Sequence, residues 1–184
     1  MTEKQKMLDG KLYNAMSDPQ LIKERQHCKT LCFNYNNLNP SDTPKRGKVI
    51  KKLFGKTKDS FLIEPNLWCD YGYNIEIGEN FYSNHNLVIL DCAKVTFGDN
   101  VLIGPNCGFY AATHPTDPIS RNKGEEYAIP ISIGNNVWIG GGVTVLPGVS
   151  IGDNCVIGGG SVVAHSIPEN SIAVGNPCKV IRKI

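Results

Sequence analysis

Residues 133–168 divide into six consecutive sixes, IGNNVW, IGGGVT, VLPGVS, IGDNCV, IGGGSV and VAHSIP. The first position of every six is aliphatic, and the second is glycine in four of them. The fifth position is mostly small or β-branched. Two further sixes, FGDNVL from Phe97 and IGPNCG from Ile103, repeat this pattern, and IGENFY from Ile77 is an additional turn two residues out of register with Phe97. A fixed period of this kind is the signature of a repeat architecture.

A period of six is neither helical nor typical of a hairpin. Each six can supply one short strand and one corner, so that three sixes make one triangular coil of about 18 residues. The aliphatic first residue then points inward and stacks on its equivalent one coil away, about 4.8 Å along the axis. Glycine and asparagine accept the backbone conformations that the corners need. The pattern predicts a parallel β-helix, held together by the stacking of successive coils.

The chain divides near residue 58, since glycine is scarce before this point and recurs after Gly72. We expect a helical module over 1–58 and a mainly β domain over 59–184. Ser17-Asp18-Pro19 is typical of a helix cap with proline in the first turn. Leu21, Cys28 and later apolar residues follow at helical spacing.

A long interruption, about 110–130, separates two good stretches of repeat. It is polar and rich in proline and charge, so we expect a loop extending from one coil. In a solenoid, function is expected where the repeat is broken. This segment contains His114, one of four histidines. It is either a hydrogen-bonded loop residue or a general base.

Composition limits the partners. The 184 residues include 19 Lys and Arg against 17 Asp and Glu, for a net charge of +2. Near-neutral charge gives no reason to expect a nucleic-acid or membrane partner, and the basic residues between Lys45 and Lys58 are expected on a solvated helix face. No apolar run approaches the length of a transmembrane span, and the N-terminus lacks the apolar core of a signal peptide. We therefore expect a cytoplasmic protein.

Seven cysteines occur without a CxxC pair, which argues against a disulfide framework or a zinc ribbon. We expect them to be small buried residues. Cys107 and Cys155 fall at inward-facing fifth positions, so neither is expected to be a covalent nucleophile. The other histidines, His27, His85 and His165, are spaced too irregularly for a three-histidine metal site, and no metal is expected.

Several segments together resemble the maltose/galactoside O-acetyltransferase family. They are CDYGYNIEIG (69–78), NFYSNHNLVILD (80–91), THP (113–115), IGNNVWIGGGVTVLPGVSIGDN (133–154), VGNPCKVIRKI (174–184) and the N-terminal MLDGKLYNA. The similarity covers nearly the whole chain and is strongest to the maltose branch. It implies a left-handed β-helix and a homotrimer that moves acetyl from acetyl-CoA to a sugar hydroxyl, with the active site between two subunits.

The same resemblance implies roles for individual residues. His114 matches the catalytic histidine and Asn84 the asparagine near the acceptor. Acceptor-binding positions map onto Asp70, Asp91 and Tyr82, and Asn14-Ala15 is expected nearby. In the galactoside branch a second acidic residue follows the one aligned with Asp91, where this chain has Cys92. Positions that bind acetyl-CoA match the following residues: Gly141, Gly159, Ala164, Lys179, Arg182 and Trp138. Gly141 would supply an N–H to the oxyanion, and Trp138 either walls the pocket or packs at the trimer contact.

The chemistry agrees with these roles. A sugar hydroxyl is a weak nucleophile at neutral pH, so a base must take its proton as the new C–O bond forms. Neutral imidazole suits this work, and attack on a thioester builds an oxyanion that needs a fixed donor. Two alternatives stay open: an acetyltransferase of the same fold with a non-sugar acceptor (an antibiotic, serine or an amino-sugar), and a non-enzymatic or metal-dependent β-helix.

Overall fold

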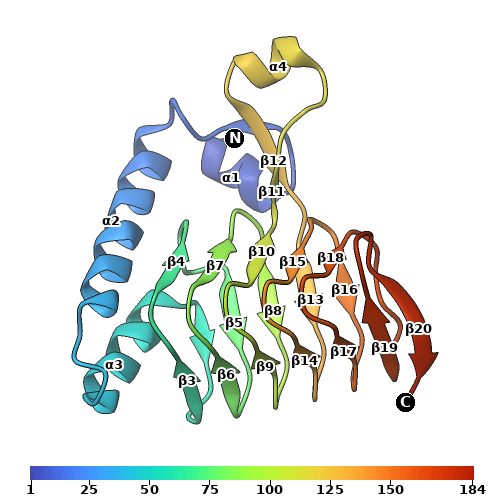
Figure 1. Ribbon diagram of the computed structural model, residues 1–184. Helices are drawn as coiled ribbons and strands as arrows, with labels where there is room; N and C mark the ends of the chain where they lie inside the picture. Colours follow the sequence, from blue (N-terminus) through green and yellow to red (C-terminus); the bar gives the residue numbers. More distant parts are fainter.

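Three parallel sheets run along the molecule and form the sides of a triangular solenoid (Figure 1). The computed structural model describes residues 1–184. Sheet A contains β4 (Leu67–Cys69), β7 (Leu87–Leu90), β10 (Gly108–Tyr110), β15 (Thr144–Val145) and β18 (Val162–Val163). Sheet B contains β2 (Lys56–Thr57), β5 (Ile75–Ile77), β8 (Val95–Phe97), β13 (Ile131–Ile133) and β16 (Ser150–Ile151).

Sheet C is the longest and ends in the one antiparallel pair of the solenoid. It contains β3 (Phe61–Ile63), β6 (Phe81–Ser83), β9 (Leu102–Ile103), β14 (Trp138–Ile139), β17 (Val156–Ile157), β19 (Ser171–Val174) and β20 (Lys179–Lys183). Strand β20 folds back on β19 and covers the C-terminal edge. The predicted left-handed parallel β-helix is therefore confirmed.

The repeat positions lie where the six-residue period placed them. All six first positions, from Ile133 to Val163, are at most 3% exposed, and the fifth positions are buried as well. Inside the earlier coils, the rings of Phe81, Phe97 and Phe109 pack edge-on at centroid distances of 5.1 and 4.9 Å. All seven cysteines are buried, as expected.

The coils differ in length, which explains the turn that is out of register in the sequence. Phe61 pairs with Phe81 across a 20-residue coil, whereas Ser132 pairs with Ser150 across 18. Ile77 therefore stacks directly on Phe97, because the earlier coils carry two extra residues.

Asparagines with left-handed backbone stack along one corner of the solenoid. Asn80, Asn100, Asn136, Asn154 and Asn170 all have φ of 55–57°. Each side-chain amide donates to the next side-chain carbonyl at 2.9–3.0 Å. Asparagine tolerates this conformation, and its amide supplies both a donor and an acceptor to the ladder.

Helices precede the solenoid and cover its N-terminal end (Figure 1). They are α1 (Glu3–Leu8), α2 (Pro19–Asn36) and α3 (Thr43–Leu53). Asp18 caps α2 by accepting from the Leu21 N–H, and Pro19 is the first helical residue, as predicted. The helical part ends at Leu53, and β2 already pairs with β5, so strand structure begins before residue 58. The division of the chain at residue 58 into two domains stays a prediction. No helix has both the length and the apolar character needed to cross a membrane.

Candidate active site

The interruption at 110–130 is a β-hairpin capped by a short helix, not an irregular loop. Strand β11 (Ala112–Thr113) pairs antiparallel with β12 (Glu125–Ala128), and α4 (Pro118–Asn122) lies between them. Strand β1 (Tyr13–Asn14) adds to the other side of β12. The hairpin stands out from the top of the solenoid in Figure 1. Asp117, followed by Pro118, caps α4, and the same signal that marks α2 at Asp18-Pro19 could have predicted this helix.

His114 follows β11, and the hairpin fixes its ring. Its Nδ1 lies 3.1 Å from the carbonyl oxygen of Glu125. A carbonyl can only accept, so Nδ1 carries the proton and Nε2 keeps a free lone pair. The Nε2 atom lies 3.9 Å from the Glu126 carboxylate. This arrangement suits a general base, since the carboxylate would stabilise the imidazolium that forms.

A cavity of about 230 Å³ lies in front of His114. Its polar lining comes from Asp70, Cys92, Glu126 and Arg25, which belong to four separate parts of the chain. The remaining lining residues are Ala15, Met16, Leu90 and Ala112. The cavity therefore joins α2, the hairpin and the exit end of sheet A.

Burial changes the pKa of two ionisable side chains at this cavity, and a third, Arg25, is held by hydrogen bonds. Burial raises the pKa of Asp70, and the Cys92 thiol donates to its Oδ2 over 3.5 Å. Burial also raises the pKa of the Cys92 thiol itself, which keeps it protonated. The Arg25 guanidinium is held at 2.7 Å by the Tyr71 hydroxyl and at 2.6 Å by the Ala15 carbonyl. The sequence did not predict Arg25 and Glu126 as cavity residues. A single arginine within a helical pattern has no feature that distinguishes a cavity residue from an exposed one.

Asp91 points away from the cavity. Its side chain is fully buried, and its Oδ1 accepts from the backbone N–H groups of Asp70 and Tyr71 at 3.0 and 2.9 Å. Its Oδ2 accepts from the Asn74 N–H at 3.3 Å. Alternation along the chain turns Asp91 inward and places Cys92 at the cavity, so Asp91 does not line this cavity and its predicted contact with the acceptor stays a prediction.

Asn84, Gly141 and Gly159 lie at the opposite edge of sheet A, where the chain enters the strands of this sheet. Asn84 directly follows β6 and begins the turn into β7, and its N–H donates to the Ile103 carbonyl oxygen at 2.9 Å. Gly104 and Gly140 continue this stack toward the C-terminus. A Cβ on Gly140 would lie 2.5 Å from the Gly159 nitrogen, so this corner must be made of glycine. The neighbouring Gly141 N–H makes no hydrogen bond within the chain, which leaves it free for a ligand.

One chain thus places the predicted site residues at two separate edges of sheet A. Asn84, Gly141 and Gly159 lie at the entry edge of sheet A, whereas Asp70, His114 and Ala164 lie at its exit edge. The four residues of β7 separate the two edges, roughly 13 Å of extended chain. The structure therefore does not bring Asn84 and His114 together within one chain.

The outer faces of the three sheets differ in polarity. Sheet C carries an apolar row that includes Tyr82, half-buried, and Trp138, which is 57% exposed. Sheet A carries Trp68, which is 42% exposed. Sheet B carries Glu76, Thr96 and other polar residues. Lys179 and Arg182 lie exposed on β20, and neither pairs with a carboxylate.

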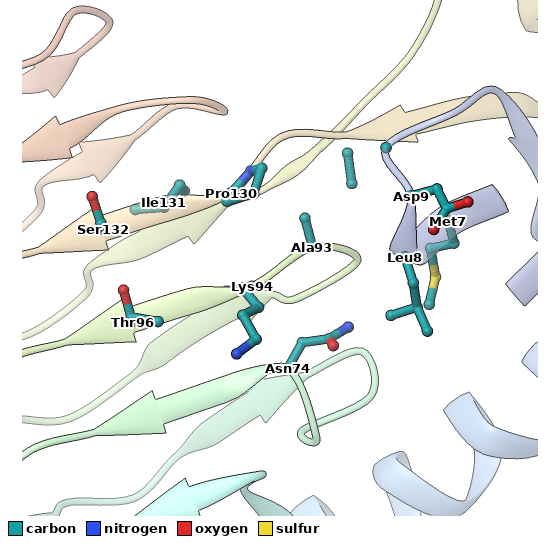
Figure 2. Close-up of a pocket in the computed structure, with 12 residues that line it drawn as sticks. Met7, Leu8, Asp9, Asn74, Ala93, Lys94, Thr96, Pro130, Ile131 and Ser132 are labelled. Carbon is teal, nitrogen blue, oxygen red and sulfur yellow. The ribbon is translucent and has the colours of Figure 1, made fainter. Parts of the chain in front are cut away.

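A larger cavity of about 600 Å³ lies between α1 and sheet B (Figure 2). Its charged residues are Asp9 and Lys94, and both are already paired, with Lys11 and Glu76 respectively. It holds no histidine, so of these two cavities the smaller one, at His114, is the better candidate active site.

The fold and this site define a hexapeptide-repeat acyltransferase. Residues 6–58 match the maltose acetyltransferase hexapeptide capping motif, and residues 130–165 match the bacterial transferase hexapeptide with six repeats. A Saccharomyces cerevisiae protein named as an acetyltransferase is 57% identical over 97% of this chain and 91% of its own.

Solved structures agree with these matches. A maltose O-acetyltransferase from Clostridium difficile 630 is 52% identical, with a TM-score of 0.97 over 100% of this chain and 98% of that one. A galactoside acetyltransferase in complex with coenzyme A is 46% identical, with a TM-score of 0.95 over 100% of this chain and 92% of that one. The chain belongs to the family of hexapeptide-repeat acetyltransferases that contains these enzymes, and it is an acetyltransferase.

Proposed function

We propose that this acetyltransferase moves an acetyl group from acetyl-CoA to a hydroxyl of a sugar, with His114 as general base. The observation that carries this proposal is the fixed tautomer of His114, whose free Nε2 faces a small cavity lined by carboxylates. Two similar structures hold coenzyme A or acetyl-CoA, and two are named for maltose or galactoside acetylation.

The reaction is a direct transfer. The acceptor hydroxyl attacks the thioester carbonyl while Nε2 of His114 takes its proton. The oxyanion that forms receives a hydrogen bond from the Gly141 N–H. The intermediate then expels the CoA thiolate, which takes the proton from the imidazolium. Glu126, 3.9 Å from Nε2, stabilises the imidazolium during this exchange.

The site proposed for the sugar contains side chains that accept hydrogen bonds and one that donates them. Asp70 and Glu126 accept hydrogen bonds from sugar hydroxyls, and Arg25 closes the cavity as a fixed cation. Cys92 contributes a weakly polar wall where an acidic residue stands in the galactoside branch. Tyr82 and Asn84 reach the acceptor from a neighbouring copy.

Acetyl-CoA occupies the groove along the glycine corner. The pantetheine arm lies along Gly141 and Gly159, where no side chains obstruct it, and extends toward Ala164. Lys179 and Arg182 bind the phosphates as exposed cations without competing partners. Trp138 packs beside the groove.

A homotrimer completes the site. Two different apolar faces, on sheets A and C, suit a ring in which each chain sets one face against the other face of its neighbour. The polar face of sheet B then stays in solvent. The proposed ring has to bring Asn84 of one chain to His114 of a neighbour, because one chain holds the two residues at opposite edges of sheet A.

The test is release of free CoA thiol from acetyl-CoA over a panel of neutral mono- and disaccharides, with serine and chloramphenicol as non-sugar acceptors. We expect turnover with at least one neutral sugar and none above background with the other acceptors. Turnover confined to a non-sugar acceptor would contradict the proposal.

A further inference from the structure

Three cysteines meet where α2 packs against the first coil of the solenoid. Cys28 and Cys32 stand one turn apart on the buried face of α2, and Cys69 ends β4. The Cys69 sulfur lies 3.5 Å from that of Cys28 and 3.7 Å from that of Cys32. All three sulfurs lie within 4.8 Å of one another. Figure 1 shows α2 running alongside this end of the β-helix.

These spacings match a single three-coordinate centre. A bond of about 2.3 Å, the length of a zinc–thiolate bond, places two sulfurs on one ion about 3.5–4 Å apart. The three side chains therefore need little rotation to share one atom. None of them takes part in the acetyl transfer proposed above.

The surroundings decide which centre fits. The exposed fractions of Cys28, Cys32 and Cys69 are 1%, 0% and 5%, so water cannot complete a coordination shell. The nearby carboxylate of Asp91 is occupied by three backbone N–H groups and offers no fourth ligand. Zinc bound by thiolates prefers four ligands, so the site is one ligand short for zinc.

Charge narrows the choice further. Three thiolates around Cu⁺ or Zn²⁺ leave a net negative charge on the complex. Burying this charge beside the carboxyl group of Asp91 is costly. A ligand that binds three sulfurs as a neutral complex avoids this cost.

We propose that Cys28, Cys32 and Cys69 form a binding site for a trivalent, thiol-seeking metalloid such as arsenite. Arsenous acid, As(OH)₃, exchanges its three hydroxyl groups for three sulfurs. Three S–H bonds and three As–O bonds break, three As–S bonds form, and three waters leave, with no change of oxidation state. The product is neutral and three-coordinate, and it links α2 to β4.

The direct test is native mass spectrometry of the reduced wild-type protein incubated with sodium arsenite. We expect one arsenic per chain, with a mass gain equal to one As(III) minus three protons. Entry requires α2 to open locally, so uptake is slow and becomes faster in mild urea. Rapid unfolding into an alkylating reagent should then label the other four cysteines and spare these three. Absence of arsenic, or protection of any other set of cysteines, would overturn the proposal.

Cysteine variants can distinguish binding of arsenic by three thiols from binding by two. Cys32→Ala should lower arsenite affinity at least 100-fold but retain phenylarsine oxide, which needs only two thiols. Cys178→Ala, which removes a buried cysteine outside the cluster, should leave both unchanged. The wild-type mass measurement stands without variants if Cys32→Ala fails to fold. In a competition experiment, Zn²⁺ or Cu⁺ that binds more tightly than arsenite would contradict the proposal that the site favours a neutral complex.

Discussion

The Nδ1 atom of His114 lies 3.1 Å from the carbonyl oxygen of Glu125 across the hairpin. This contact ties the tautomer of the base to the register of β11 and β12. Any acceptor hydroxyl in the cavity therefore meets an imidazole nitrogen with a free lone pair. The rigid hairpin, rather than the solenoid itself, supplies this orientation.

Removing this base should stop chemistry but not CoA binding. We expect His114→Ala to lower kcat by about 10²–10⁴-fold with a good sugar acceptor, because the hydroxyl loses its base. The dissociation constant for acetyl-CoA, measured by calorimetry, should change little. His165→Ala, an exposed histidine after β18, is the matched control and should keep wild-type kcat. A near-wild-type kcat for His114→Ala would mean that another group takes the proton.

Two inactive variants should rescue each other. If each site takes His114 from one chain and Asn84 from its neighbour, an equal mixture of His114→Ala and Asn84→Ala chains forms intact sites at about a quarter of positions. We expect about a quarter of wild-type activity after the chains are unfolded together and refolded. His114→Ala refolded with His114→Asn should stay inactive. No gain in the mixed sample would place both residues in one chain or neither in the site.

The exposed side chains of Lys179 and Arg182 on β20 should strengthen the binding of acetyl-CoA. Lys179→Ala with Arg182→Ala should raise KM for acetyl-CoA more than it lowers kcat, because phosphate contacts lie far from the reacting carbon. The difference should shrink at high salt, where exposed charges are screened. Lys94→Ala, on the outer face of sheet B, is the control. A defect confined to kcat would argue against a phosphate role.

Asp91 should make stability depend on pH. Burial raises the pKa of this carboxyl to about 7 in the folded chain, against about 3.9 when unfolded. Between these values the native state holds a proton that the unfolded state has lost, so the free energy of unfolding falls as pH rises from 4 to 7. Asp91→Asn keeps an acceptor for the N–H groups of Asp70 and Tyr71 but cannot titrate.

Urea unfolding of wild type and Asp91→Asn at several pH values measures this effect. The stability of wild type relative to the variant should fall by about 2–4 kcal/mol between pH 4 and 7.5. A relative stability that rises with pH would mean that the backbone N–H groups outweigh burial and keep the pKa low.

The stacked asparagines should stabilise the fold in two ways: through the hydrogen bonds of their side-chain amides, and because asparagine tolerates the left-handed backbone at this corner. Asn136→Ala removes two amide bonds and forces alanine to φ of 55°, so we expect a loss of about 2–3 kcal/mol in urea unfolding. Asn136→Gly loses the same bonds without the backbone cost and should be about 1 kcal/mol less damaging. Equal losses for the two variants would show that backbone conformation is not what selects asparagine here.

The six-residue period alone determined the solenoid and its interior. Ile133 and its equivalents could be placed inward because the period of six repeats a local geometry, and the helix cap at Asp18-Pro19 is likewise a local signal. His114 could be singled out because it lies in the one long break of the repeat. These features depend on residues close together in the chain, which is why sequence reasoning reached them.

Only the tertiary structure decided which neighbours face each other. Asp91 and Cys92 are adjacent in sequence and both buried, but after β7 Asp91 turns inward whereas Cys92 lines the cavity. Strand β12 of the hairpin at 110–130 also pairs with β1, which lies about 110 residues earlier in the chain. Cys69 meets Cys28 across 41 positions only when α2 packs on β4. Such contacts arise from the packing of distant segments, and no local pattern encodes them.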